Sequence, residues 1–420
     1  MYEAFACPGL SHTQPPQLGN ATRERDFQPH RTSLHDDPAA PPLRIVHVLR
    51  APVGGLFRHV LDLAREQAAL GHQVGLIADS LTGGARGEAL LAELEPKLAL
   101  GLLRLPIQRA PSPSDISVLI AISRRLAIVN PDVVHGHGSK GGLFARLAGT
   151  PFGRVDGVRC YTPHGGSLNY LPGAASHAAF MRVEALLAFR TDLLLFESGF
   201  IADRFHMEVG PARHLEKIVR NGLARSELTP VTANADAADL LYLGEFRSVK
   251  GLDTLLDSLA LLARASRRPK LALIGDGPEK ALLLQRAKRL GVHDQLVVKA
   301  PMAARDAYAQ GRVLISPSRL ESLPYVVLEA AAARMPLVAT AVGGVPEIFG
   351  PFADRLIPSD DPQILAGAIA AALDENPERA ARKADELASY VAENFSLERM
   401  VCDVVYSYRE AIAAKARRGA

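Results

Sequence analysis

Short apolar runs alternate with helical patterns along the chain from residue 43 onwards. The run LRIVHVL at 43–49 is β-branched and aliphatic, which is typical of a buried strand. Apolar residues then recur at helical spacing from Leu56 to Ala64, and Gly71 ends that helix. Further strands of this first series are predicted at 73–78, 132–135, 157–161, 192–196 and 217–220.

A second series of the same kind begins after a polar break. Residues 226–239 are small, polar and turn-forming, which is typical of an interdomain linker. Helical patterns such as 251–264 and 279–290 separate the apolar runs that follow. Strands of this series are predicted at 240–244, 271–275, 296–299, 313–317, 337–340 and 355–358. Continuous apolar strands with helices between them indicate parallel sheets covered on both faces.

The two series predict an α/β fold with two Rossmann-like, doubly wound domains facing an interdomain cleft. The N-terminal domain is predicted over 43–230 and the C-terminal domain over 236–385. Residues 1–42 are rich in Pro, His, Asp, Arg and Ser without apolar periodicity, which predicts a disordered extension. Residues 386–420 are predicted to form a helix that packs back toward the N-terminal domain. Ligand-binding residues should follow the strands, where loops and helix N-termini gather free backbone N–H groups.

Composition narrows the class of protein. A length of 420 residues fits two domains, and a hydrophobic share of 48% excludes disorder of the whole chain. The formal charge is only +3, which argues against a nucleic-acid binder. Three distant cysteines form no disulfide framework, and the N-terminal residues lack the pattern of a secretory signal. No apolar stretch is long enough to span a membrane, so we expect a cytoplasmic protein with at most peripheral membrane contact.

Two glycine-containing loops after strands are candidate anion sites. Gly54 and Gly55 follow the first strand, where glycine lets the backbone approach an anion closely, although a simple tight turn explains them equally well. The second loop, GEFRSVKG at 244–251, places Arg247 and Lys250 between a strand and a helix. Two cations beside helix N-terminal amides are suited to a diphosphate, and the alternative is solvated surface charge.

Carboxylates and a third glycine loop follow later strands. Glu321 lies in the loop after the strand at 313–317, and Glu329 lies inside a helix that we expect to begin near Pro324. Glu329 shares a stripe with alanine and valine, so its carboxylate needs a polar partner such as a pair of sugar hydroxyls. Gly343 and Gly344 form a turn whose amides can meet a phosphate or a sugar.

Three histidines of the N-terminal domain, in or directly after predicted strands, are candidate site residues. His135 and His137 are two residues apart in one strand and therefore share a face, and His164 follows the next strand in TPHGG at 162–166. A metal site would need a third ligand, and none is evident from the sequence. The chain also contains no D-x-D pair, which would hold a divalent ion on a diphosphate. The sequence therefore predicts no metal site.

These motifs, in this order and spacing, resemble the retaining family-4 glycosyltransferases of the GT-B fold. The resemblance covers about 43–410 and depends mainly on the C-terminal motifs, in which Glu321 and Glu329 form an E-x7-E frame. Those motifs are GEFRSVKG (244–251), LIGDGPE (273–279), PSRLESLPYVVLEA (317–330) and PLVATAVGGVPEI (336–348). Weaker marks are GG (54–55), DVVHGHG (132–138), TPHG (162–165) and NG (221–222).

The resemblance implies a metal-independent hexosyltransferase that takes a nucleoside-diphosphate sugar as donor substrate and needs no cofactor. By analogy, Arg247 and Lys250 neutralise the diphosphate, and Glu329 binds the ribose. Glu321 orients the donor sugar together with Ser322, Leu323 and Pro324. From the N-terminal domain, Gly54, Gly55 and His164 approach the phosphates and sugar, while the base rests on the loop from Lys299 to Met302. His164, Lys250 and Glu321 are the implied catalytic residues.

The implied acceptor is a saccharide or lipid-linked saccharide, in surface polysaccharide or glycolipid assembly at the inner membrane. The helix around 178–190 carries apolar and basic residues that suit an anionic lipid surface, although packing inside the first domain is the alternative. The sequence identifies neither the donor sugar and base nor the linkage. Other functions of the fold that we weigh are a nucleotide-sugar epimerase, a phosphorylase-like enzyme and a non-catalytic sugar-nucleotide-binding protein. The missing G-x-G-x-x-G motif disfavours a dehydrogenase.

The chain departs from the family pattern at three positions. Glu245 stands where many relatives have arginine, so the role of Arg247, two residues later, is less secure than that of Lys250. Arg334 stands where glycine is common, and a left-handed arginine costs about 1 kcal/mol. Ala224 stands where aspartate often follows the NG motif.

Overall fold

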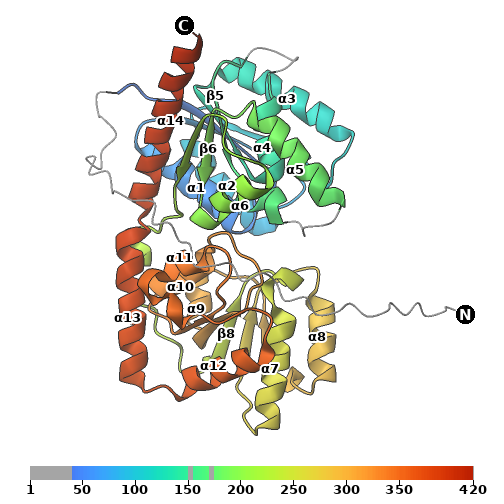
Figure 1. The fold of residues 1–420 in the computed structure, drawn as a ribbon, viewed down its shortest axis with the longest axis vertical. Helices are drawn as coiled ribbons and strands as arrows, with labels where there is room; N and C mark the ends of the chain where they lie inside the picture. The colour runs from blue at the N-terminus through green and yellow to red at the C-terminus, as the bar shows by residue number, and fades with distance from the viewer. Residues whose placement is uncertain (1–39, 150–154, 170–174, 420) are drawn as a thin grey trace, which may run out of the picture. The chain divides into compact units, whose positions relative to one another are not determined.

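The N-terminal lobe is built on a sheet of seven parallel strands (Figure 1). The computed structural model describes residues 40–149, 155–169 and 175–419; most of the predicted disordered extension therefore lies outside the described residues. The strand order is β3-β2-β1-β4-β5-β6-β7. The strands are β1 (Arg44–Leu49), β2 (Gln73–Asp79), β3 (Leu102–Leu105), β4 (Val133–His137), β5 (Val158–Thr162), β6 (Leu193–Phe196) and β7 (Leu215–Ile218). This order reverses direction between β1 and β4, which is where such folds bind ligands.

Helices cover this sheet on both faces. Continuous apolar strands require such cover, and separate cores form on the two sides, one around Val48 and Ile122 and another around Ile45 and Val401. The helices are α1 (Gly54–Ala69), α2 (Gly84–Leu94), α3 (Ser114–Val129), α4 (Gly138–Leu147), α5 (Ala175–Ala188) and α6 (Gly199–Glu208), with short 3-10 turns at Glu95–Lys97, Gly166–Asn169 and Arg225–Glu227.

The C-terminal lobe repeats this plan with five parallel strands in the order β10-β9-β8-β11-β12. Its strands are β8 (Ala238–Leu243), β9 (Leu271–Ile274), β10 (Leu296–Lys299), β11 (Gly311–Ser316) and β12 (Leu337–Ala339). Its helices are α7 (Leu252–Arg264), α8 (Lys280–Arg289), α9 (Ala304–Tyr308), α10 (Tyr325–Ala332), α11 (Val345–Phe349) and α12 (Pro362–Asp374), with 3-10 turns at Ser248–Lys250, His293–Gln295 and Gly350–Arg355. Direction reverses here between β8 and β11. The predicted pair of doubly wound α/β domains is confirmed.

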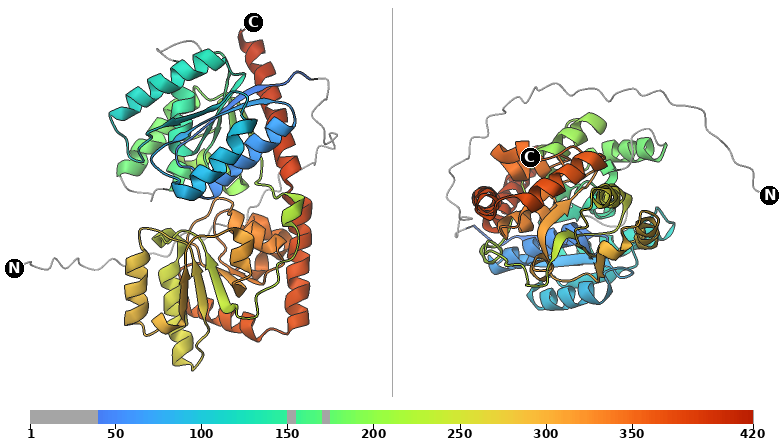
Figure 2. Two further views of the ribbon diagram at one scale, coloured as in Figure 1. Left: turned by 180° about the vertical axis from the view of Figure 1, so that it is seen from behind. Right: turned by 90° about the horizontal axis from the view of Figure 1, so that it is seen from below.

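Two long helices end the chain. Helix α13 (Pro377–Asn394) packs against α10 and α11 of the C-terminal lobe, whereas α14 (Leu397–Gly419) packs beside β5, β6 and α1 of the N-terminal lobe (Figures 1 and 2). Val401, Val404 and Tyr408 of α14 are buried in the core of that lobe. The predicted boundary at residue 386 therefore lies inside α13. None of the helices in the described ranges combines the length and apolar character needed to cross a membrane.

Several local predictions were wrong. The strand at 355–358 does not form, and only a single bridge joins Thr340 to Ile357 there. Strand β3 was not predicted, because Arg104 interrupts its apolar run. Strand β7 begins two residues earlier than predicted, and helix α1 begins at Gly54 rather than at Leu56.

Candidate active site

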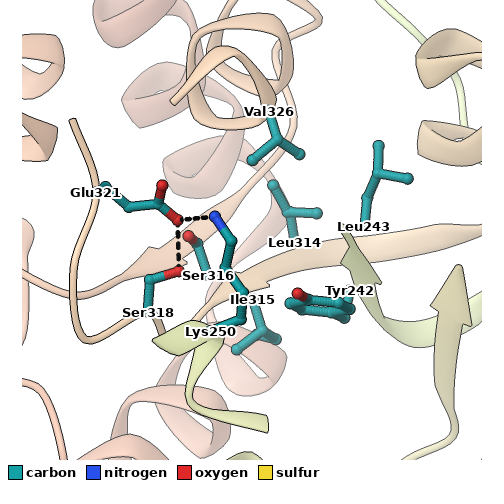
Figure 3. A pocket seen from close by; sticks show the side chains of 9 residues that line it. All are labelled: Tyr242, Leu243, Lys250, Leu314, Ile315, Ser316, Ser318, Glu321 and Val326. Atoms are coloured by element: carbon teal, nitrogen blue, oxygen red, sulfur yellow. Dashed lines mark hydrogen bonds and ion pairs between the residues drawn. The ribbon is translucent and has the colours of Figure 1, made fainter. Parts of the chain in front are cut away.

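Lys250 and Glu321 meet at the carboxyl edge of the C-terminal sheet. Lys250 ends the loop after β8 and Glu321 lies in the loop after β11, and these two strands are neighbours. The Nζ atom of Lys250 donates to Oε1 of Glu321 at 2.6 Å, and the hydroxyl of Ser318 donates to the same oxygen at 2.6 Å (Figure 3). Glu321 is buried, and a buried carboxylate is stable only with such partners. The pair lines a small cavity of about 10 Å³.

Two glycines let the loops around this pair pack closely. Gly251 has a φ of +66°, and a Cβ atom there would lie 2.0 Å from the carbonyl oxygen of Pro317. Gly343 has a φ of +58°, and its Cβ would lie 1.6 Å from the carbonyl oxygen of Glu321. Only glycine fits at either position. The loops after β8, β11 and β12 are thereby held against one another around Glu321.

Arg247 and Lys250 line different cavities of the C-terminal lobe. Its Nη1 atom lies 3.6 Å from Oε2 of Glu245, and its side chain is part-exposed. Arg247 lines a separate cavity of about 270 Å³, together with residues of α7 and α8 such as Asp253 and Arg286. The predicted diphosphate pair is therefore divided between two cavities in this structure.

Glu329 holds partners from both lobes. One carboxylate oxygen is ion-paired with Arg58 of α1, and Oε2 accepts a hydrogen bond from the hydroxyl of Tyr308 at 2.9 Å. Arg58 also pairs with Glu227 at 2.6 Å, and its guanidinium lies 4.4 Å from the ring centroid of Tyr325. A ribose that binds Glu329 would have to share or displace the guanidinium of Arg58. This contact could not be predicted from the sequence, because it joins residues of α1 and α10 that are 271 positions apart.

The loop formed by Ser322, Leu323 and Pro324 is also tied to the N-terminal lobe. The carbonyl oxygen of Leu323 accepts from Nδ2 of Asn221 at 2.8 Å, and Asn221 Oδ1 lies 3.0 Å from Nδ1 of His59. Pro324 is the N-cap residue of α10, so the helix begins one residue later, at Tyr325. Asn221 of the NG motif therefore connects a buried histidine to the loop predicted to hold the donor sugar.

Gly54 and Gly55, directly after the loop that follows β1, lie near the start of α10. Gly54 has a φ of +70° and begins α1. A Cβ atom on Gly55 would lie 3.4 Å from the ring of Tyr325, at the start of α10. The loop predicted to hold the base also contacts the N-terminal lobe, since Arg86 donates to the carbonyl oxygen of Met302 at 2.7 Å.

His164 lies at the carboxyl edge of the N-terminal sheet in a left-handed conformation, with a φ of +50°. Its Nε2 atom is 3.1 Å from Nδ1 of His137. Its ring meets the ring of His59 edge-on at 4.8 Å between centroids. Burial lowers the pKa of His164 well below its ordinary value, so the ring is neutral at physiological pH.

The sequence missed further histidines beside these. His47 of β1 pairs in register with His135 of β4, and His59 of α1 lies on the same side of the lobe. The third possible ligand that was not evident from the sequence is His47, because possible ligand atoms of His47, His135 and His137 lie within 4.8 Å of one another. The signal was available: His47 occupies β1, which neighbours β4 in a doubly wound sheet.

Glu197, which follows β6, was also missed. It is 1% exposed, and among the described residues neither carboxylate oxygen completes a hydrogen bond of good geometry. Burial raises the pKa of Glu197 to about 7, and the backbone N–H groups of Glu197 and His164 and the hydroxyl of Ser322 oppose that rise. No motif marks this residue, and the Ser322 hydroxyl that acts on it comes from the other lobe.

Known proteins resemble the chain over both lobes. Residues 227–387 match the family described as glycosyl transferases group 1, and residues 54–222 match the glycosyl transferase 4-like domain. D-inositol 3-phosphate glycosyltransferase 1 of Catenulispora acidiphila is 30% identical over 313 residues, which cover 67% of this chain and 72% of the relative. Glycogen synthase of Mycobacterium tuberculosis is 27% identical over 377 residues, which cover 79% of this chain and 85% of the relative.

Solved structures show the same fold. A structure of Anabaena HepE in complex with UDP-glucose superposes with a TM-score of 0.70 at 17% identity, covering 87% of this chain and 100% of that one. Its two-lobed architecture is the GT-B fold, which is thus the fold of this chain. By sequence and by fold, the chain belongs to the group 1 glycosyltransferases.

Proposed function

We propose that the protein is a retaining, metal-independent hexosyltransferase that moves a sugar from a nucleoside diphosphate to an acceptor hydroxyl. The observation that carries the proposal is the pairing of Lys250 with buried Glu321 at the carboxyl edge of the C-terminal sheet. This edge lies at the point where the strand order reverses, which is where open α/β sheets bind ligands.

Lys250 supplies charge where the reaction needs it. When a nucleoside diphosphate leaves, negative charge builds on its β-phosphate, and a fixed cation there stabilises the transition state. One preorganised donor of this kind contributes roughly 3 kcal/mol. Glu321 and Ser318 hold the lysine side chain in place, so its ammonium group is positioned before the donor arrives. The chain has no D-x-D pair, and we therefore assign the charge to Lys250 rather than to a metal ion.

The proposed transfer occurs on one face of the sugar. The bond from the anomeric carbon to the β-phosphate oxygen breaks, the acceptor oxygen forms the new bond, and its proton passes to the departing phosphate. This course retains the anomeric configuration and needs no carboxylate nucleophile, in contrast to retaining hydrolases. Glu321 and the loop of Ser322, Leu323 and Pro324 would orient the sugar from the C-terminal lobe, with His164 and Gly55 opposite. Glu329 would bind the ribose.

UDP-glucose is the first donor to test, because the HepE structure of the same fold was determined with it. The identity of the acceptor is the least constrained part of the proposal. Similarity to a glycogen synthase favours a growing saccharide, and we extend this to surface polysaccharide or glycolipid assembly in the cytoplasm.

Helix α5 supports peripheral contact with a membrane. Val183 and Leu186 of α5 are 42% and 69% exposed, and Arg182 beside them is also exposed. Phe189, directly after the helix, is 61% exposed, with the guanidinium of Arg213 4.1 Å from its ring centroid. Leu187 of the same helix is buried, so α5 packs on the lobe with one face and presents apolar and basic side chains on the other. Flotation with phosphatidylglycerol vesicles tests this: wild type should float, and Leu186→Glu should not.

Donor turnover tests the proposed function. The protein is incubated with UDP-, GDP- and ADP-hexoses and candidate saccharides, and release of nucleoside diphosphate is measured with and without EDTA. We expect one donor to turn over equally well with EDTA, and NMR of the product to show the anomeric configuration of the donor. Inhibition by EDTA that Mn²⁺ reverses would refute metal independence, and an inverted product would refute retention.

A further inference from the structure

Five histidines gather at the carboxyl edge of the N-terminal sheet, and the proposed reaction uses only one of them. The five are His47 of β1, His59 of α1, His135 and His137 of β4, and His164 after β5. His47, His59, His135 and His137 are each no more than 3% exposed. Burying so many ionisable rings is costly unless each is neutral and hydrogen-bonded.

Three of these rings are joined end to end. Nε2 of His47 lies 2.8 Å from Oε1 of Gln67. Nδ1 of His47 lies 2.9 Å from Nε2 of His137. Nδ1 of His137 lies 3.1 Å from Nε2 of His164. A continuous chain of hydrogen bonds therefore runs from Gln67 to His164, and we call these four residues the imidazole chain.

Each ring in the imidazole chain carries a single proton. Burial lowers the pKa of His47 to about 4 and lowers the pKa values of His137 and His164 well below the ordinary value. A neutral imidazole has one nitrogen that donates and one that accepts. Fixing the direction of one hydrogen bond therefore fixes the direction of all the others.

Gln67 sets that direction. Its carboxamide oxygen can only accept, so His47 carries its proton on Nε2 and accepts at Nδ1. His137 must then donate from Nε2 to His47 and accept at Nδ1. His164 must donate from Nε2 to His137, and its remaining nitrogen, Nδ1, has a lone pair.

We propose that Gln67, His47 and His137 are positioning residues that hold His164 in its Nε2–H tautomer, so that Nδ1 accepts a hydrogen bond from a sugar hydroxyl. The proposal rests on the proposed function and specifies what His164 recognises there: a hydroxyl group that donates, not a carbonyl or phosphate oxygen.

A metal ion is the competing explanation for the cluster. Possible ligand atoms of His47, His135 and His137 lie within 4.8 Å of one another, as do those of His59, His137 and His164. A metal would require lone pairs that hydrogen bonds already use, since both ring nitrogens of His137 lie in the imidazole chain. His135 is likewise engaged, at 2.6 Å with the hydroxyl of Tyr408 and at 2.8 Å with that of Thr162.

NMR of the full chain labelled with ¹⁵N-histidine reads the tautomers directly, because protonated and bare ring nitrogens have different shifts. Signals of His164 are assigned by their loss in His164→Gln. We expect Nε2 of His164 to be protonated and Nδ1 bare in the wild type, and a mixed tautomer in His47→Ala. Protonation at Nδ1 in the wild type would overturn the proposal. This readout needs no turnover, so it stands apart from any failure to find a donor.

Enzyme kinetics then distinguishes a positioning role of His137 from a role in packing alone. His137→Ala breaks the imidazole chain, whereas His135→Ala removes an equally buried ring whose centroid is 3.9 Å away but which lies outside the chain. We expect kcat to fall about tenfold or more in His137→Ala, as for loss of a hydrogen bond made in the transition state, and to change less than about twofold in His135→Ala. Equal losses in two variants that both fold would assign the histidines to packing and overturn the proposal. One equivalent of zinc in the purified protein would overturn it in favour of a metal site.

Discussion

The two lobes share one architecture but differ in the charge of the side chains at the points where their strand orders reverse. In the C-terminal lobe a charged lysine and a charged glutamate meet between β8 and β11. In the N-terminal lobe neutral histidines fill the corresponding position between β1 and β4. A donor diphosphate is stabilised by a fixed cation, whereas a sugar hydroxyl can donate to a neutral imidazole nitrogen whose tautomer is held in place. The same topological position therefore holds either an ion pair or a set of neutral rings, depending on the side chains that its strands and loops carry.

Lys250→Ala removes the cation from the ion pair of the C-terminal lobe and should have the largest effect on turnover. Loss of the cation should lower kcat by about 10²- to 10³-fold, because charge on the leaving phosphate is no longer stabilised. Lys270→Ala is the matched control, since Lys270 precedes β9 at the opposite edge of the same sheet and donates to the carbonyl oxygen of Asp294. Turnover within about twofold of wild type in Lys250→Ala, with the fold intact by circular dichroism, would show that the cation has no such role.

Glu197→Gln tests whether the N-terminal side excludes charge. Burial raises the folded-state pKa of Glu197 from 4.5 to about 7, so between these values the folded protein binds a proton that the unfolded chain has lost. Wild-type stability should therefore fall as pH rises through that window, and the variant should lack this loss. Between pH 5 and pH 8 we expect the variant to gain roughly 2 kcal/mol relative to wild type, by urea unfolding. A difference that does not change with pH would contradict a raised pKa for the buried carboxyl of Glu197.

Glu329→Gln tests whether Glu329, which pairs with Arg58 of the other lobe, also binds the nucleotide-sugar donor. If Glu329 accepts hydrogen bonds from a ribose, its neutral amide should weaken UDP-glucose binding by about tenfold in calorimetry. Tyr308→Phe is the control, because it removes a hydrogen bond to Glu329 but keeps the carboxylate. Donor affinity that is unchanged in Glu329→Gln would leave Glu329 only its contacts with Arg58 and Tyr308.

Arg334→Gly should have the smallest effect and compares backbone strain in the two lobes. Arg334 follows α10 with a φ of +58°, and glycine there should stabilise the protein by about 1 kcal/mol. The lost ion pair with Asp385 at 3.1 Å is half-exposed and contributes little. In the N-terminal lobe Asn130 has a φ of +42° after α3, and Asn130→Gly should gain less because asparagine tolerates this conformation. Urea unfolding that shows no gain for Arg334→Gly would contradict the strain.

The fold and the position of Lys250 and Glu321 at one edge of the C-terminal sheet could be predicted, because both depend on local sequence patterns. Continuous apolar runs identified most strands, and the order of a doubly wound sheet brings the loops of Lys250 and Glu321 together. Strand β3 was missed because a polar residue divides it, and the strand at 355–358 was wrong because an apolar run alone does not supply a pairing partner.

The imidazole chain depends on contacts between segments that are far apart in the sequence. His47 lies 90 residues before His137, and Gln67 faces them from α1, so no spacing rule connects the three. The contact of Arg58 with Glu329 and that of Ser322 with Glu197 each join residues of the two lobes. Such pairs have no signature in one sequence.

A crystal structure of the protein with UDP-glucose bound would test the assignment of donor chemistry to protein side chains. We expect the diphosphate to contact Nζ of Lys250, with the sugar between Glu321 and His164 and a sugar hydroxyl on Nδ1 of His164. A diphosphate remote from Lys250, or one held by a bound metal ion, would contradict this assignment.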